Sequence, residues 1–301
     1  MGLRVAAALA AIAAAPPVDA ASYYFSSLGN DATGNGSLAT PWQSIGKLNS
    51  LSLRPGDNAL FRAGDTFTGK MWLDANDAGT NALGNFVAPV TISSYGAVGA
   101  TTRAKIVSPY NSEAFVAYNA GGIDLSNLEF VSGGFSNGGR TNGVHFLLDQ
   151  AAHGAFSRVK HIRVDNVVSN GFGLSGLQVW AHNTMGFADV KVTGSEFSGN
   201  GYAGVYVGAT QSQYKTHSDV VIDGVSAHDN PGYVGALPIT GHGVILANTD
   251  GGAIQNSVAY DNGKVNGNGG RPCPAGFHYS SDNNSRWLTI DELQRLVAGH
   301  E

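Results

Sequence analysis

Five segments of the chain repeat one alternation of apolar and polar residues around a central Asn or Gly. The segment "DVVIDGVSAHDN", residues 219–230, is a clear copy. The five centres are Asn127, Asn166, Gly194, Gly224 and Asn256. Their spacings are 39, 28, 30 and 32 residues. Such a repeat indicates one structural unit used several times.

The apolar residues lie two and four positions before most centres and one and three positions after them. Two positions before the centres stand Leu125, Val164, Val192, Ile222 and Ile254. This period of two predicts strands with one buried face. The alternation breaks at each centre, where Asn and Gly tolerate the left-handed conformation that turns a corner.

A third strand is predicted between successive centres. Its copies are "GVHFL" 143–147, "GLQVW" 176–180, "GVYVG" 204–208, "GVILA" 243–247 and "GFHYS" 276–280. Three short strands per unit leave no room for a helical crossover, and a unit this small buries its face only by stacking on its neighbours. The pattern therefore predicts an all-β, right-handed, single-stranded parallel β-helix. A β-propeller has a similar repeat, but its antiparallel blades need hairpin turns that are scarce here.

The ends of the chain follow other patterns. Residues 1–21 carry Arg4, a short apolar run and small residues, which predicts a signal peptide and a secreted or periplasmic protein. Residues 22–120 are expected to form an N-terminal cap and the first coils, with a capping helix in "PWQSIGKLNSL" 41–51. Residues 121–292 are assigned to the coils, and 293–301 to a helical cap or a non-native tail of a truncated chain.

Composition narrows the function. The net charge is −5 and no basic run exists, which argues against nucleic-acid binding. The single cysteine, Cys273, excludes an internal disulfide and a cysteine-based metal site. No long apolar run follows the signal segment, so no membrane span is expected in the mature chain. Nothing in the sequence sets the oligomeric state.

Residues 23–69, "YYFSSLGNDATGNGSLATPWQSIGKLNSLSLRPGDNALFRAGDTFTG", resemble the N-terminal segment of the pectate-lyase-like β-helix superfamily. The coils match its general repeat. The resemblance implies a secreted protein that acts on polysaccharides. The adjacent Asp pair of polygalacturonase-like hydrolases is absent, as are the Trp-x-Asp-His and Arg-x-Pro-x-x-Arg motifs of classical pectate lyases. No catalytic residue is therefore carried over by motif.

The resemblance also implies a substrate groove along the strand that begins with Gly. The outward positions of that strand are His145, Gln178, Tyr206, Ile245 and His278, with Trp180 at the next outward position. Aromatic and imidazole rings suit the apolar faces of sugar rings, although a solvent-facing ladder without function has the same pattern. We expect Trp180, Gln178, His182, His217 and His278 to bind substrate.

A lyase acting on a uronate needs a base for the proton next to the carboxylate, and a cation that stabilises the resulting charge. The base candidates are Lys215, Tyr206 and His145. Arg140 or Arg286 could neutralise the carboxylate, and calcium could do so through Asp149, Asp250 and Asp282. The histidine spacing does not fit a zinc site.

Two classes of function stay open on these patterns. The first is a polysaccharide lyase on an acidic, uronate-containing glycan, with a glycoside hydrolase or an epimerase as alternatives. The second is a non-catalytic, adhesin-like β-helix that only binds glycans, because fold alone does not set function. Convergence of His145, Tyr206, Lys215 and an Arg or a carboxylate in one groove would favour the enzyme.

Overall fold

The computed structural model describes residues 20–96, 102–136, 139–149, 157–211, 213–232, 240–263, 276–280 and 286–288. Nearly all of the predicted signal segment and the whole predicted C-terminal cap, 293–301, lie outside these residues. No helix in the described ranges is long and apolar enough to cross a membrane.

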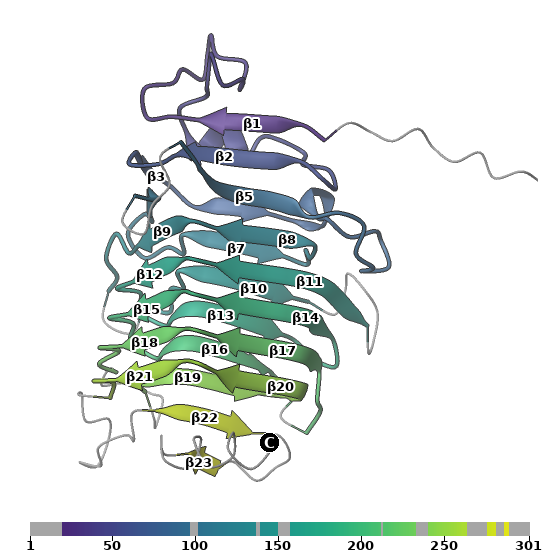
Figure 1. The fold of residues 1–301 in the computed structure, drawn as a ribbon, viewed down its shortest axis with the longest axis vertical. Coiled ribbons are helices and arrows are strands. Elements are labelled where there is room, and N and C mark those ends of the chain that lie inside the picture. Colours follow the sequence, from purple (N-terminus) through teal and green to yellow (C-terminus); the bar gives the residue numbers. More distant parts are fainter. Residues whose placement is uncertain are drawn as a thin grey trace, which may run out of the picture.

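The described residues form three parallel sheets that wind around one axis (Figure 1). Sheet A contains β1 (Ser22–Phe25), β2 (Asn58–Arg62), β5 (Val90–Tyr95), β8 (Ile123–Ser126), β11 (Arg158–Asp165), β14 (Gly186–Thr193), β17 (His217–Asp223) and β20 (Thr249–Gln255). Sheet B contains β3 (Thr66–Thr68), β6 (Ala104–Val107), β9 (Leu128–Val131), β12 (Val168–Asn170), β15 (Glu196–Ser198), β18 (Ser226–His228) and β21 (Val258–Tyr260).

Sheet C contains β4 (Met71–Leu73), β7 (Phe115–Tyr118), β10 (Val144–Leu148), β13 (Ser175–Ala181), β16 (Ala203–Ala209), β19 (His242–Ala247), β22 (Phe277–Ser280) and β23 (Arg286–Leu288). From β2 to β22 each coil contributes one strand to every sheet, and each of these strands pairs in parallel with its counterpart in the next coil, whereas β1 and β23 are additional edge strands. The predicted all-β parallel solenoid is therefore confirmed, while its hand stays a prediction.

Two short helical turns accompany the strands, α1 (Ile45–Leu48) and the 3-10 turn η1 (Ala75–Asp77). The Ser44 hydroxyl accepts a hydrogen bond from the Lys47 amide at the start of α1, and Ile45 and Leu48 are buried. The turn α1 lies inside the segment expected to form a capping helix. Its role as a cap stays a prediction.

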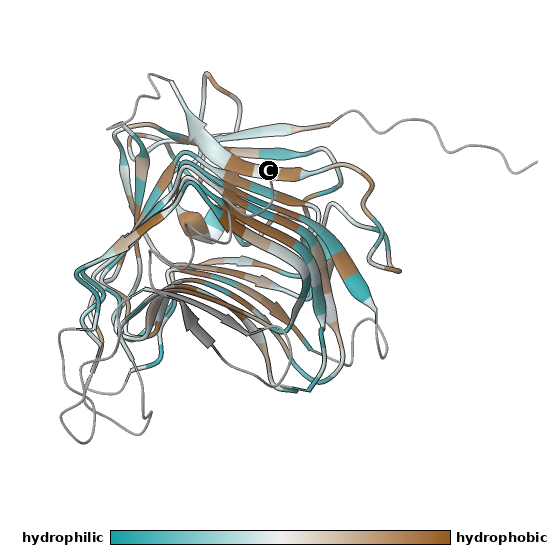
Figure 2. Cartoon of the chain, turned by 60° about the horizontal axis from the view of Figure 1, so that its bottom comes forward, coloured by the Kyte–Doolittle hydropathy of each residue, from teal (hydrophilic) through white to brown (hydrophobic). Residues whose placement is uncertain are grey.

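The five repeat centres adopt the conformation that the broken alternation predicts. Their φ angles are 55° at Asn127, 51° at Asn166, 53° at Gly194, 63° at Gly224 and 50° at Asn256. The column Leu125, Val164, Val192 and Ile222 is fully buried. Figure 2 shows the same alternation as brown and teal bands along the strands. The periodic register predicted from the sequence is thus confirmed.

A second left-handed position, near the start of the sheet A strands, was not predicted. His161, Asp189 and Asp219 have φ angles of 66°, 56° and 54°. The paired register skips these residues, since Ala188 pairs with Ser218 and Val190 with Val220. An extra residue in a strand shifts the alternation by one position. Residues that precede the left-handed position therefore face the opposite side of the sheet from the side that strict alternation predicts.

Buried asparagines connect the coils at the turn that follows sheet B. The Asn200 side-chain amide donates to the Asn230 carbonyl oxygen (3.0 Å), and that of Asn230 donates to Asn262 (2.8 Å). All three residues are buried. Each amide thus satisfies its neighbour inside the turn, where an unpaired polar group would be costly.

The C-terminal edge departs from the parallel pairing predicted for the coils, which were assigned to residues 121–292. Instead, β23 pairs antiparallel with β22 at the edge of sheet C, and Phe277 lies opposite Leu288. An antiparallel partner covers hydrogen-bonding groups that a terminal strand would leave exposed. Residues 289–292 lie outside the described residues.

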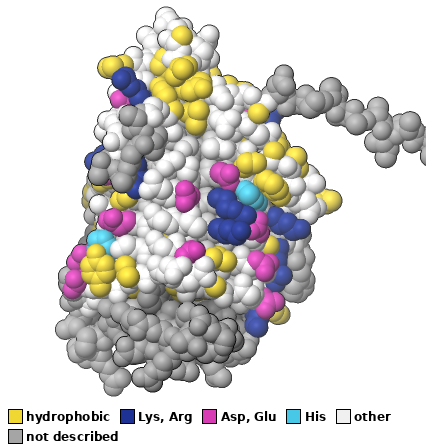
Figure 3. All heavy atoms as spheres, viewed as in Figure 1, with side chains coloured by type: hydrophobic (Ala, Val, Ile, Leu, Met, Phe, Trp, Pro, Cys, Tyr) yellow, Lys and Arg dark blue, Asp and Glu magenta, His cyan; other side chains and the backbone are white. Residues whose placement is uncertain are grey.

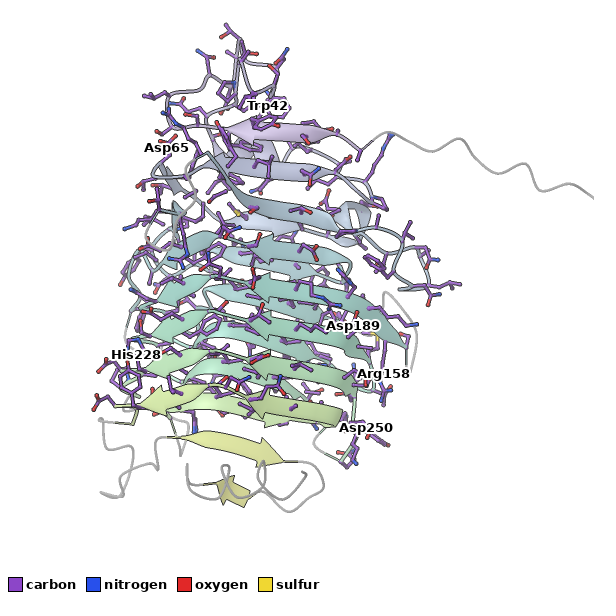
Figure 4. All side chains as sticks on the ribbon, in the orientation of Figure 1. Trp42, Asp65, Arg158, Asp189, His228 and Asp250 are labelled. Carbon is purple, nitrogen blue, oxygen red and sulfur yellow. The ribbon has the colours of Figure 1, made fainter. Side chains whose placement is uncertain are left out.

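The outer face of sheet A carries charges that neutralise one another. Arg163 Nη2 lies 2.6 Å from Asp189 Oδ2, and His161 Nε2 lies 2.8 Å from Asp124 Oδ1. Figure 3 shows basic side chains beside acidic ones on this face. Figure 4 places Arg158, Asp189 and Asp250 along one edge of it. This face therefore offers no strongly charged surface of one sign.

Candidate active site

A hollow of about 390 Å³ lies on the outer face of sheet C. Its lining comes from β10, β13, β16, the segments before them, the segment before β7 and the residue after β13. The lining residues are Glu113, Arg140, Asn142, His145, Leu147, Leu174, Gln178, Trp180, His182, Tyr202 and Tyr206. Six of these had been selected from the sequence: Arg140, His145, Gln178, Trp180, His182 and Tyr206.

Strand register brings the central residues of the hollow into line. His145 pairs with Gln178, Gln178 with Tyr206, and Tyr206 with Ile245, on four neighbouring strands. Trp180 pairs with Leu147, one side-chain position further along. The predicted ladder thus exists. Its members are more enclosed than expected, because Gln178 and Ile245 are only 6% and 3% exposed.

The polar centre of the hollow is a pair formed by His145 and Glu113. His145 Nδ1 lies 2.6 Å from Glu113 Oε1, and the side chains are 12% and 22% exposed. An ionised carboxylate only accepts hydrogen bonds, so the proton of the neutral ring lies on Nδ1. The lone pair is then on Nε2. That atom is buried without a hydrogen-bond partner among the described residues.

The surroundings of Glu113 keep it ionised. Burial is the largest single influence and raises its pKa, but the hydrogen bond from His145, the charge of that ring when it is protonated, the Asn142 amide and the charge of Lys70 together outweigh it. The net result is a lowered pKa. Asn142 Nδ2 also donates to Gln178 Oε1 at 2.8 Å. Glu113 is therefore suited to orient His145 and unsuited to donate a proton near neutral pH.

Aromatic rings form one wall of the hollow. The Tyr206 ring centroid lies 5.2 Å from that of Trp180 and 5.1 Å from that of Tyr202. Burial, followed by the effects of the Tyr202 phenol and the hydrogen bond between the two side chains, raises the pKa of Tyr206 well above its usual range. Tyr206 therefore keeps its proton at neutral pH. It is therefore better suited to donate a proton than to act as the base, which is the role the sequence had suggested for it.

Arg140 supplies a positive charge to the hollow. It precedes β10 in the chain and its side chain is exposed. A guanidinium can bind a carboxylate through two parallel hydrogen bonds. The hollow thus combines an oriented imidazole, a protonated phenol and a cation, and Lys215 is not among its lining residues.

Lys215 lies elsewhere on the solenoid. Its ammonium nitrogen is 3.8 Å from Asp250 Oδ1, and its backbone oxygen accepts a hydrogen bond from Arg158 Nη2 (2.8 Å). The structure therefore does not bring Lys215 together with His145 and Tyr206. Of the convergence that would favour an enzyme, His145, Tyr206, Arg140 and the carboxylate of Glu113 are therefore together, and Lys215 is absent from the lining.

His217 does not contact the hollow, which corrects its assignment as a substrate-binding residue. Its side chain is fully buried, Nε2 lies 2.8 Å from the Gly208 backbone oxygen, and Nδ1 accepts a hydrogen bond from the Phe187 amide (3.1 Å). The left-handed residue Asp219 reverses the strand parity, so His217 faces the core. Burial, the largest influence, lowers its pKa to about 4.

The proposed calcium ligands are not gathered in the described residues. Asp149 follows β10 and accepts a hydrogen bond from the Tyr118 hydroxyl (3.1 Å). Asp149 belongs to the connection from β10 to β11, whereas Asp250 lies in β20. In sheet A, the two strands β14 and β17 separate β20 from β11. No group of three or more His, Cys, Asp or Glu residues in the described ranges could hold a metal ion. Asp282 lies outside those ranges.

For two further candidate residues, His278 and Arg286, the structure describes only the backbone. His278 in β22 pairs with Ile245, which places it in the predicted column. Arg286 begins β23 at the edge of the same sheet. The Glu113 carboxylate, in contrast, was missed from the sequence. It lies in "YNSEAF" 110–115, just before β7, a strand that was not predicted from the sequence. No sequence pattern therefore marked Glu113.

No protein-family model matches the chain, and no curated protein matches it significantly. Among solved structures, an alginate lyase from Paenibacillus sp. str. FPU-7 has a TM-score of 0.49 and 19% identity, covering 72% of this chain and 64% of that one. The GH136 lacto-N-biosidase from Eubacterium ramulus has a TM-score of 0.44 and 14% identity, covering 78% and 45%.

Pectate lyase Pel9A has a TM-score of 0.42 and 17% identity, covering 80% of this chain and 64% of that one. The chain thus spans at most 64% of the length of these three proteins. TM-scores below 0.5 do not indicate that two proteins catalyse the same reaction. The fold stands on the strand pairing described above, and it is the parallel β-helix that the resemblance to pectate-lyase-like proteins implied.

Proposed function

We propose that this protein is a polysaccharide lyase that cleaves an acidic, uronate-containing glycan by β-elimination in the hollow on sheet C. The observation that carries the proposal is the convergence of the Glu113–His145 pair, the protonated Tyr206 and Arg140 on one hollow. The proposed substrate lies outside the cell, which agrees with the predicted signal peptide. The resemblance of the sequence to pectate-lyase-like proteins supports the same class of activity.

In the proposed reaction, Arg140 binds the uronate carboxylate and stabilises the charge that develops on it. His145 Nε2 accepts the proton from the carbon next to the carboxylate, while Glu113 holds the Nδ1 proton. The electron pair forms a carbon–carbon double bond and the glycosidic carbon–oxygen bond breaks. Tyr206 donates its proton to the leaving oxygen. The products are a new reducing end and an unsaturated uronate.

The covered position of Nε2 adds one requirement to this reaction. Nε2 is buried, so a neighbouring side chain must rotate before a substrate proton can reach it. Such tightening and rearrangement on substrate binding is usual for catalytic acids and bases. The unpaired nitrogen also carries a desolvation cost that a substrate contact would relieve.

Glycoside hydrolysis is the weaker enzymatic alternative. That reaction normally uses two carboxyl groups, one of them protonated as a general acid. Glu113 is the only carboxylate among the residues that line the hollow, and its pKa is lowered. The hollow therefore lacks the second carboxyl group, and the first is not suited to give up a proton at neutral pH.

The test uses the purified full chain and a panel of pectate, alginate and glycosaminoglycans, each with and without calcium. The conjugated double bond of an unsaturated uronate absorbs in the ultraviolet, so cleavage appears as rising absorbance. We expect a rise on at least one glycan, and none for His145→Ala. New reducing ends without absorbance would identify a hydrolase. Binding without either product would identify a glycan-binding protein, and both results would overturn the proposal.

A further inference from the structure

A second pair of aromatic rings in contact, Trp72 and Tyr118, lies on sheet C, and Trp72 is in line with the column of His145. Trp72 in β4 pairs with Val116 in β7, and Val116 pairs with His145 in β10. The Trp72 ring stacks on Tyr118 with a centroid distance of 5.8 Å and an angle of 24°. Trp72 is 38% exposed. Trp72 therefore extends the row of paired residues that contains His145 by two strands, from β10 to β4.

A cation accompanies this ring. The Lys70 ammonium nitrogen lies 4.9 Å from the Trp72 ring centroid. No carboxylate among the described residues lies within ion-pair distance of Lys70, although its charge contributes to the lowered pKa of Glu113. Lys70 is thus near enough to influence the hollow electrostatically and has no carboxylate of its own.

The Asn49 side chain holds the backbone of Lys70 and Trp72 through two hydrogen bonds. Asn49, at the end of α1, donates a hydrogen bond from Nδ2 to the Lys70 backbone oxygen (2.8 Å) and accepts one from the Trp72 amide at Oδ1 (3.0 Å). Both contacts use main-chain atoms, one of Lys70 just before β4 and one of Trp72 within it. Changes to the Lys70 or Trp72 side chain therefore leave these two hydrogen bonds available.

We propose that Lys70 and Trp72 form an outer sugar-binding position, at which Lys70 binds the carboxylate of a second uronate residue of the chain held in the hollow. The proposal rests on the function proposed above. Neighbouring strands are ~4.8 Å apart, close to the advance per sugar of an extended pyranose chain. From β4 to β16 are four strand steps, so the two positions together would hold about five sugars.

The contributions of the Lys70 charge and of the Trp72 ring to binding can be tested separately. Lys70 should bind only an acidic sugar, because a neutral sugar offers no counter-charge, whereas the Trp72 ring should contact either. Replacing Lys70 by Gln should therefore weaken binding of a uronate oligomer. The same oligomer with its carboxylates reduced to alcohols should bind Lys70→Gln as well as it binds the wild type. Trp72→Ala should weaken both.

The experiment measures calorimetric binding of uronate oligomers of two to eight residues, from the glycan best bound in the panel, to wild type, Lys70→Gln and Trp72→Ala. We expect wild-type affinity to rise with length up to about five sugars. Each variant should bind the longer oligomers at least about tenfold more weakly and the dimers as the wild type does. Measurements at two salt concentrations should show the Lys70 effect shrinking at the higher one.

Matched controls lie elsewhere on the solenoid. Lys47 makes the same kind of contact, with its ammonium 5.3 Å from the Trp42 ring centroid, so Lys47→Gln tests for a general loss of charge. Tyr260 is 46% exposed on β21 in sheet B, so Tyr260→Ala tests for loss of any exposed ring. Neither control should change the dependence of affinity on length.

The outcomes separate this proposal from the proposed lyase activity. Long oligomers bound and cleaved equally well by the wild type, Lys70→Gln and Trp72→Ala would overturn the outer position and leave the lyase intact. Length-dependent binding that needs Lys70 and Trp72, without an unsaturated product, would support the outer position and overturn the lyase. A wild type that binds no acidic oligomer would overturn both.

Discussion

His145 Nδ1 and Glu113 Oε1 lie 2.6 Å apart although 32 positions separate the two residues in the sequence. The parallel pairing of β7 with β10 brings them together, because Glu113 precedes β7 and His145 lies within β10. The contact assigns one ring nitrogen to Glu113 and leaves the other for a substrate. This relationship gives the hollow the arrangement of a base and the group that orients it.

Replacing Glu113 by Gln should reduce turnover far more than binding. A Gln amide can donate to Nδ1 and thereby move the ring proton to Nε2, where it would block proton transfer. We expect kcat to fall by about 10²- to 10⁴-fold with little change in oligosaccharide affinity. Steady-state kinetics and calorimetry would measure the two effects.

Glu129→Gln is the control for this substitution. Glu129 is also partly buried and forms an ion pair with Lys105 (3.1 Å), but it lies in β9 of sheet B. Its variant should keep wild-type turnover. Equal losses of kcat in the two variants would show that Glu113 has no special relation to the reaction.

Tyr206→Phe should retain the ring packing and remove only the proton donor. The raised pKa of Tyr206 keeps its phenol protonated beyond pH 10, the usual value for tyrosine. We therefore expect kcat to fall by about 10²-fold while the melting temperature stays close to that of the wild type. Tyr24→Phe in β1 is a control away from the hollow and should be as active as the wild type.

An ultraviolet titration would examine the same residue independently. Tyrosinate absorbs more strongly than tyrosine, so the wild type and Tyr206→Phe should give the same titration curve up to pH 10. A difference that appears below pH 10 would mean that Tyr206 ionises there, and it could not then be the protonated donor proposed here.

His217→Met should lower stability at pH 7 and flatten its dependence on pH. The folded pKa of about 4 lies below the reference value of 6.5, so wild-type stability from this residue is complete above pH 6.5 and is lost as the pH falls towards 4. Within that window the loss approaches about 1.4 kcal/mol per pH unit. Met cannot titrate, but it leaves the Phe187 amide and the Gly208 oxygen unpaired.

Urea denaturation of both proteins between pH 7 and pH 4 would measure these slopes. His228 lies on sheet B near Glu196 and Asp229, so His228→Gln should keep the slope that His217 gives the wild type. A His217→Met protein that lost stability with falling pH as steeply as the wild type would refute the assignment.

Val192→Asp should prevent stable folding. Val192 is fully buried and pairs with Val164 on one side and Ile222 on the other. A carboxylate there has no partner and must be desolvated or protonated, at a cost of at least about 3 kcal/mol. Circular dichroism and thermal unfolding would measure the loss.

The adjacent residue supplies the control for Val192→Asp. Lys191 is exposed and lies opposite Arg163, so Lys191→Asp places the same side chain outside the core and beside a cation. This variant should melt close to the wild type. A normal melting temperature for Val192→Asp itself would contradict the register.

The sequence predicted the core because the period of a strand is local information. Leu125, Val164 and Ile222 could be placed inside from their spacing alone, and the ladder of His145, Gln178 and Tyr206 follows from the opposite parity. His217 was expected in a polar loop, but it begins β17, and the left-handed residue Asp219 reverses the strand parity so that His217 faces the core. Asp at this position has no distinctive pattern, since Asp is also common in ordinary turns.

The chemistry of the hollow was less predictable than its location. Glu113 becomes important only through its contact with His145 in the next coil, and no local pattern encodes a contact between coils. Lys215 was selected for being a cation in a polar loop, but the loop directs it towards Asp250. The phenol of Tyr206 acquires its raised pKa from burial against Trp180 and Tyr202, which a linear pattern does not reveal.

The ladder of Asn200, Asn230 and Asn262 shows that three successive coils offer their neighbours the same polar group at the turn after sheet B. From Gly194 to Gly224 the repeat is 30 residues long, and a second copy inserted after the first would place its own Asn between Asn200 and Asn230. Such an insertion would lengthen the molecule by one strand spacing without redesigning its core. For the proposed glycan substrate, the number of stacked coils would set the length that can be bound, and selection could adjust that number separately from the reacting groups.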